Sequence, residues 1–201
     1  YYDKTSINNK GMVLVNIPTQ STAVKPNPRF PVGIRVVDLR TRQKVNLIDS
    51  ETYTWQQGVR SQWIDDDVVV FNVLKDNKYK ALAYSLDERI VVKEFEFPVQ
   101  DAYLKDYFLS INYSRIMALR PDYGYRSLAI PSRTELECLD NDGIWYVSYN
   151  DGESKLLYTL QEIISVEPKD TFDVSLHKVN HLMIKPDGKG FIFIHRWYRG
   201  K

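Results

Sequence analysis

The chain has 201 residues, of which 43% are hydrophobic and 13% aromatic, enough for one large or two small domains. Its 27 basic residues nearly balance 26 acidic ones, so a net charge of +1 gives no cationic excess for nucleic-acid binding. The absence of an apolar stretch of about 18 residues argues against a membrane span. Cys138 is the single cysteine, which excludes an intrachain disulfide. Since no signal-peptide pattern is visible either, we expect a cytoplasmic rather than a periplasmic location.

Strand patterns recur along the chain, separated by turn residues at spacings typical of all-β folds. Helix patterns are scarce. Residues 158–166 read either as the end of a strand or as a short helix, because their apolar residues have helical spacing. The predicted strands are, in chain order, residues 33–39, 44–48, 68–74, 79–86, 90–97, 107–111, 144–149, 155–160, 180–185 and 191–198.

Two long segments interrupt this pattern. Residues 16–31 contain four prolines and are predicted to be a loop that crosses a rim of the fold. Residues 119–142 form a second insertion with little periodicity. Loops of this length in a compact domain are usually functional or disordered, so both segments are candidates for function.

The spacing and burial pattern of the strands predict a β-propeller. Strand groups recur about every 45 to 60 residues, the period of a four-stranded blade. Residues 68–71 and 191–194 are apolar at every position, as expected for sheets stacked between two neighbours. We therefore predict about three four-stranded blades (residues 1–54, 55–100 and 101–170) and the first hairpin of a fourth (171–201).

Such an arc cannot close a ring, so open sheet faces would be exposed. The sequence also stops directly after a strongly predicted strand. We expect these residues to be part of a six- to eight-bladed ring, whose remainder comes from the same chain or from a second copy.

A resemblance to known propellers rests on four short segments. Residues 180–189 (NHLMIKPDGK) resemble the strand and turn of TolB-type propeller repeats. Residues 55–58 with Trp63, residues 120–125 and residues 195–197 narrow the likeness to a group of bacterial propellers distantly similar to oligogalacturonate lyases. The resemblance covers about residues 33–201, and members of the group are roughly twice this length, which implies an N-terminal part of such a protein.

The resemblance also implies a site. Oligogalacturonate lyases hold a divalent metal with several histidines and a glutamine near the propeller axis and use a further histidine in catalysis. His181, His195 and Gln57 correspond here as metal ligands, with His181 and His195 also as catalytic residues. The remaining ligands would lie beyond Lys201.

The geometry of the histidines limits which of them can share a metal. His177 and His181 are four residues apart, which on one strand separates them by about 13 Å, too far for a single ion. His181 and His195 share a face of the last hairpin if residue 181 pairs with 193 or 195, and lie on opposite faces if it pairs with 194. Alternatively, these histidines cap loops or fill space between blades through hydrogen bonds.

An arginine–tyrosine cluster surrounds the second long segment. Guanidinium groups grip carboxylates and aromatic faces stack on sugar rings, so the cluster suits an acidic glycan, with Arg120 neutralising its carboxylate. Alternatively, arginine bonds to the backbone pin a loop. The cluster consists of Tyr113, Arg115, Arg120, Tyr123 and Tyr125.

Further binding candidates are Trp55 and Gln57, whose segment precedes a strand, and Arg196 and Trp197 beside His195. The amides of this segment could bind a polar ligand or metal, or could instead satisfy neighbouring backbone groups around a packed tryptophan.

Several other segments are predicted to have no catalytic or metal-binding role. Residues 65–67 (three aspartates) read as a solvated turn, and residues 140–143 begin like a calcium loop but lack its later ligands, so they also read as a turn. Cys138 has no CxxC partner and is predicted to be a plain thiol. Motifs of nucleotide hydrolysis, Rossmann binding, zincin proteolysis and α/β-hydrolases are missing.

The sequence therefore predicts two alternative functions from different classes. The first is a non-catalytic binding or scaffold propeller that recognises a glycan or protein, favoured because no complete catalytic set is visible. The second is a metal-assisted lyase or glycoside-degrading enzyme acting on an acidic glycan, with His181, His195, Gln57 and Arg120 as its site.

Overall fold

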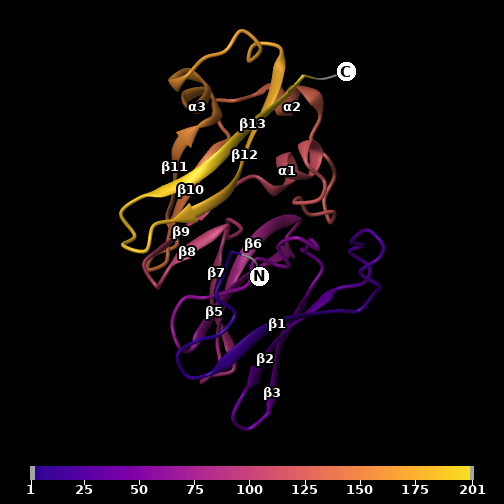
Figure 1. Cartoon of the computed structure of the whole chain (residues 1–201), viewed down its shortest axis with the longest axis vertical. Helices are drawn as coiled ribbons and strands as arrows, with labels where there is room; N and C mark the ends of the chain where they lie inside the picture. Colours follow the sequence, from indigo (N-terminus) through magenta and orange to yellow (C-terminus); the bar gives the residue numbers. More distant parts are fainter. Residues whose placement is uncertain (1–2, 200–201) are drawn as a thin grey trace.

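The computed structural model describes residues 3–199, which form four antiparallel sheets and three short helices (Figure 1). The all-β prediction is confirmed. The first two sheets contain β1 (Met12–Pro18), β2 (Val32–Asp38) and β3 (Lys44–Ser50), then β4 (Gln62–Trp63), β5 (Val68–Lys75), β6 (Lys78–Ser85) and β7 (Ile90–Phe95). The next two contain β8 (Asp101–Tyr103), β9 (Tyr107–Ser110), β10 (Gly143–Ser148) and β11 (Ser154–Thr159), then β12 (Ser175–Ile184) and β13 (Phe191–Arg199).

The second and third sheets each consist of four consecutive strands joined as a meander, in the orders β4-β5-β6-β7 and β8-β9-β10-β11. A meander of four strands is also the strand arrangement of a propeller blade. In β5 the first six residues are all buried, because successive side chains enter two different cores. The prediction that both faces of residues 68–71 are covered is therefore confirmed. The same prediction is wrong for residues 191–194, because Ile192 and Ile194 on one face of β13 are 65% and 42% exposed.

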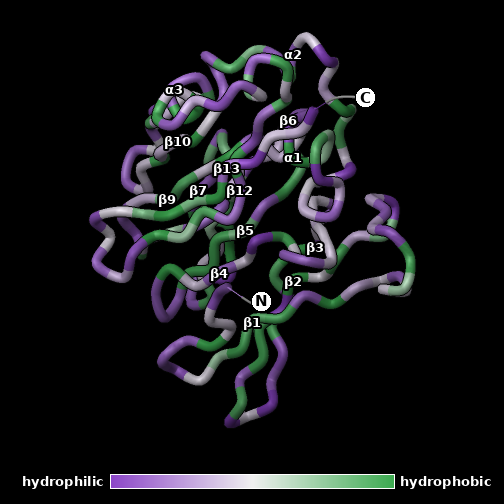
Figure 2. Tube along the Cα trace, turned by 45° about the horizontal axis from the view of Figure 1, so that its top comes forward, coloured by the Kyte–Doolittle hydropathy of each residue, from purple (hydrophilic) through white to green (hydrophobic). Residues whose placement is uncertain are grey.

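Three apolar clusters fill the spaces between consecutive sheets. Val69 and Phe71 of β5 belong to the cluster shared with the first sheet, whereas Val68 and Val70 face the third sheet. A further cluster joins the third sheet to the fourth through residues such as Val179. Figure 2 shows hydrophobic (green) stretches running along the strands and hydrophilic (purple) ones in the outlying loops.

The helices begin at side-chain caps. They are α1 (Tyr113–Leu119), α2 (Arg133–Glu137) and α3 (Leu160–Val166). Ser132 and Thr159 cap α2 and α3 in complete capping boxes with Glu135 and Glu162. The helical reading of residues 158–166 is thus confirmed for α3. Among residues 3–199, none of the helices has the length and apolarity needed to cross a membrane.

Two expectations about loops need correction. Residues 16–31 are not entirely loop, because β1 continues to Pro18, which pairs with Val32. Proline is tolerated at this last position of an edge strand, where no further ladder bond is required. Residues 119–142 are not structureless either, since they contain α2, whose Leu136 is buried.

Candidate functional site

A buried lysine lies in the middle of β12. Lys178 is 0% exposed, and its Nζ donates to no acceptor within residues 3–199. Successive strand residues alternate between faces, so Val179 enters the core while Lys178 faces the opposite side. There its ammonium lies 5.6 Å from the centre of the Tyr198 ring, a weak substitute for a hydrogen-bond acceptor.

Two arginines surround this lysine. Arg196 of β13 is its partner in the strand register, and Arg120 follows α1. Burial first, and then the charges of Arg196 and Arg120, lower the pKa of Lys178 to about 8. The Nε of Arg120 is buried without a hydrogen bond, and the nearest carboxylate oxygen, on Asp122, is 3.9 Å away. We call Arg120, Lys178 and Arg196 the cationic cluster.

The bulge in β12 adds polar groups beside the cationic cluster. Asn180 is 3% exposed, and both its amide nitrogen and its amide oxygen lack partners within residues 3–199. His181 follows with a φ of 54°, because the register shifts between Asn180 and Met183. Burial, followed by the charges of Arg196 and Lys178, lowers the pKa of His181. Its ring therefore favours the neutral form.

The structure brings together several residues predicted for the site. The ring of Tyr123 lies edge-on to His181, with centres 4.8 Å apart, and the Arg120 guanidinium lies 5.7 Å from the Tyr123 ring. Arg120, Tyr123, His181 and Arg196 thus gather around Lys178. Sequence reasoning missed Lys178 and Asn180, because a lysine or asparagine in a strand normally indicates an exposed face.

The two histidines predicted to share a metal have different neighbours. His195 pairs in register with Val179 and lies with its Nε2 3.0 Å from Nδ1 of His177, whereas His181 lies in the bulge and has no register partner. Within residues 3–199 there is no group of three or more histidine, cysteine, aspartate or glutamate side chains suited to a metal. The metal-assisted alternative, with Gln57 as a further ligand, stays a prediction.

Arg115 holds the second long segment in place. Its guanidinium pairs with Asp142 and donates to four backbone carbonyl oxygens, those of Glu135, Leu136, Cys138 and His177. The interpretation that an arginine pins this segment through backbone bonds is confirmed for Arg115.

Two tyrosines of the predicted cluster belong to the core. Tyr125 is 0% exposed and stacks on Tyr113 at 4.1 Å between ring centres, while Tyr79 contacts it edge-on. Its hydroxyl accepts from the Asn72 amide. Tyr125 therefore has no ring face free for a sugar, which corrects the expectation that it forms part of a binding surface.

Trp55 and Gln57 lie away from the cationic cluster, in the turn before β4. Trp55 lines two small cavities of about 230 and 240 Å³, and its Nε1 donates to the Val24 carbonyl at 2.6 Å. Gln57 is buried, and its backbone N–H donates to Thr54. The interpretation of Trp55 as a packed tryptophan is confirmed, and the same residue lines the two cavities.

Residues 65–67 and 140–142 lie outside the strands, as predicted for turns, whereas Gly143 already begins β10. Asp65 accepts hydrogen bonds from the backbone N–H groups of Asp67 and Val68 and pairs with Lys105, so this turn is half-buried rather than fully solvated. Cys138 is an exposed free thiol. Asp142 pairs with Arg115.

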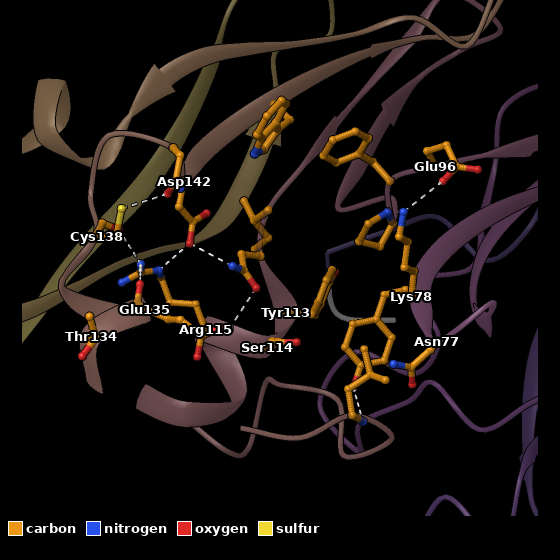
Figure 3. A pocket seen from close by; sticks show the side chains of 18 residues that line it. Asn77, Lys78, Glu96, Tyr113, Ser114, Arg115, Thr134, Glu135, Cys138 and Asp142 are labelled. Atoms are coloured by element: carbon orange, nitrogen blue, oxygen red, sulfur yellow. Dashed lines mark hydrogen bonds and ion pairs between the residues drawn. The ribbon is translucent and has the colours of Figure 1, made fainter. Parts of the chain in front are cut away.

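A cavity of about 770 Å³ opens between the β6–β7 side and the segment that carries α1 and α2 (Figure 3). Arg115 and Asp142 lie on one side of it, and Lys78 and Glu96 on the other. Phe97 and Trp145 also line it, with ring centres 4.7 Å apart. Arg115 and Asp142 in this cavity form a buried ion pair, whereas the acidic neighbour of the cationic cluster within residues 3–199 is Asp122, whose carboxylate oxygen lies 3.9 Å from Nε of Arg120.

No family model and no curated protein matches the chain. Among solved structures, it is similar to the β-propeller domain of the Trilobed protease from Pyrococcus furiosus, with 13% sequence identity and a TM-score of 0.43. The match covers 95% of this chain and 51% of that one, so the chain spans about half the length of its structural neighbour.

Proposed function

We propose that the chain is an arc of a β-propeller that acts as a binding module, and that its cationic cluster recognises the carboxylate of an acidic glycan. The observation that carries this proposal is the fully buried, unpartnered ammonium of Lys178. An uncompensated buried charge costs several kcal/mol in proteins, roughly 3 to 5 when its partner is missing. A bound carboxylate supplies the missing partner.

The propeller part of the proposal rests on the sequence of sheets. In this proposal the second and third sheets are complete blades, the first is a three-stranded blade, and β12–β13 is the first hairpin of a fourth. We infer a six- to eight-bladed ring, completed by the same polypeptide or by a second copy. TolB-type membership belongs to the same proposal and rests on the residues 180–189 alone.

The first strands of the successive sheets converge, as strands at a propeller axis do. Arg60, before β4, donates to the carbonyl of Gln100, before β8. Asp101 of β8 accepts from the backbone N–H of Ile184 in β12 at 2.7 Å. Lys178 of the cationic cluster therefore lies on the innermost strand of its sheet, where converging loops and strand edges commonly form ligand sites.

The chemistry of the cationic cluster fits a uronate. Guanidinium groups can hold a carboxylate through two parallel hydrogen bonds, and a buried ammonium strengthens that interaction in a low-dielectric surrounding. The unpartnered amide of Asn180 offers both a donor and an acceptor to sugar hydroxyls. Tyr123 adds an aromatic face near the same groups.

Calorimetric titration with trigalacturonate and with its methyl ester tests this proposal. We expect the free acid to bind at least about tenfold more tightly, because only the acid carries the charge that a hydrogen-bonded cation recognises. Arg196→Gln is expected to weaken binding of the acid by about tenfold or more. Its matched control is Arg199→Gln, an exposed arginine on the same strand, which should leave the affinity unchanged.

The competing outcomes are distinct. Equal affinity for acid and ester, or equal loss in Arg196→Gln and Arg199→Gln, contradicts recognition of a carboxylate by the cationic cluster. No binding of either sugar contradicts the assignment of an acidic glycan as the ligand.

A further inference from the structure

Another cavity lies on the opposite face of β13 from Arg196. It has a volume of about 600 Å³ and is enclosed by α3, β11, β13 and the segment before β12. Because side chains alternate along a strand, His195 and Trp197 face this cavity while Arg196 faces the cationic cluster. The two sites are therefore separate. The lining residues with aromatic rings are Tyr158, Phe172, Phe193, His195 and Trp197.

The walls of this cavity are mainly apolar and partly open to solvent. Val166 is 80% exposed, Tyr158 49% and Trp197 38%, so apolar side chains form the mouth of the cavity. Phe172 lies edge-on to Trp197 with ring centres 5.0 Å apart, so the inner wall is ordered by ring packing. Such a cavity suits a flat apolar molecule.

Two histidines in contact, His177 and His195, determine which nitrogen atoms beside the cavity can donate a hydrogen bond and which can accept one. Nε2 of His177 lies 3.0 Å from the carbonyl oxygen of Phe172, which can only accept, so His177 carries its proton on Nε2. In a neutral His177 the other nitrogen, Nδ1, then has no proton and must accept. The Nε2 of His195, 3.0 Å away, is consequently the donor in that bond.

With the protons in these positions, the remaining ring nitrogen of His195, Nδ1, is a hydrogen-bond acceptor. A neutral His195 that carries its proton on Nε2 has a lone pair on Nδ1, which can accept a hydrogen bond. Burial, and then the neighbouring His177 and Lys178, lower the pKa of His195 to about 4, so the ring is neutral at pH 7. The aromatic wall thus carries one hydrogen-bond acceptor.

We propose that this cavity binds a flat, largely apolar aromatic molecule that donates one hydrogen bond to Nδ1 of His195. The volume of about 600 Å³ falls within the usual range of small-molecule sites, about 300 to 1,000 Å³. Of the charged side chains that line the cavity, Glu162 already accepts from the backbone N–H and hydroxyl of Thr159 as a helix cap.

The test compares indole with 1-methylindole, which has nearly the same shape but no N–H donor. Binding to the full chain at pH 7 is followed by calorimetry. We expect indole to bind about five- to tenfold more tightly, the effect of one net hydrogen bond. His195→Phe keeps an aromatic ring but removes the acceptor, so the preference for indole is expected to disappear.

A second pair of variants tests the location without touching the core. Val166→Arg places a charge at the mouth and is expected to weaken binding of both ligands at least about tenfold. Val174→Arg is the matched control, because Val174 is 64% exposed and does not line the cavity. Equal affinities of the two indoles, unchanged binding in Val166→Arg, or no binding at all would each overturn the proposal.

Discussion

Replacing Arg115 by methionine is expected to lower the free energy of unfolding by about 3 to 5 kcal/mol. The methionine retains much of the apolar stem, but it leaves the Asp142 carboxylate and four backbone carbonyls buried without their donor. Breaking one side of a buried ion pair is costly for this reason. Urea unfolding at pH 7, followed by circular dichroism, measures the change.

The loss of stability in Arg115→Met is expected to begin around α2 and β12. Arg115 connects the carbonyls around α2 with that of His177 in β12, so amide hydrogen exchange should accelerate in residues 132–142 and in β12 before it does in β5. The control is Arg133→Met. Arg133 pairs with Glu137 on the surface, with side chains 63% and 51% exposed, and its loss is expected to change stability by less than about 0.5 kcal/mol. A similar effect of both variants would contradict the anchoring role of Arg115.

Most strands were predictable because their apolar runs are long enough to leave a pattern. β5, buried on both faces, is the clearest example. β4 and β8 contain only two and three residues, too few for any periodicity to appear. The helices α2 and α3 had a usable signal in the sequence, since Ser132 and Thr159 are each followed three residues later by a glutamate.

The fourth sheet shows why the site was harder to predict than the fold. The sequence predicts a strand over residues 180–185, whereas β12 begins at Ser175. His177, Lys178 and Asn180 interrupt the apolar pattern, so the polar residues that form the two candidate sites also concealed half of their strand. Their burial depends on the register with β13 and on the segment after α1, which are both tertiary features.

Lys178→Met is expected to raise the stability of the ligand-free protein by about 3 kcal/mol at pH 7. The wild-type protein must bury an ammonium that has no acceptor, beside two arginine charges, and methionine fills a similar volume without that penalty. Urea unfolding of both proteins measures the difference. Lys155→Met, at an exposed position of β11, is the control and should change stability by less than about 0.5 kcal/mol.

The pH dependence of that difference identifies its cause. The pKa of Lys178 is about 8 in the folded protein and near its model value of 10.5 in the unfolded chain, so between these values the unfolded state binds more protons. Wild-type stability therefore rises with pH in this window, and the advantage of Lys178→Met disappears by about pH 10.5, since shared tyrosine titrations cancel between the two proteins. A difference that does not change with pH would mean that methionine stabilises through packing alone.

Saturation with an acidic ligand should close the same gap in stability at pH 7, because the ligand stabilises only the protein that keeps the ammonium. Burial of Lys178 would then be a cost that the free protein carries so that the bound one can recognise a carboxylate.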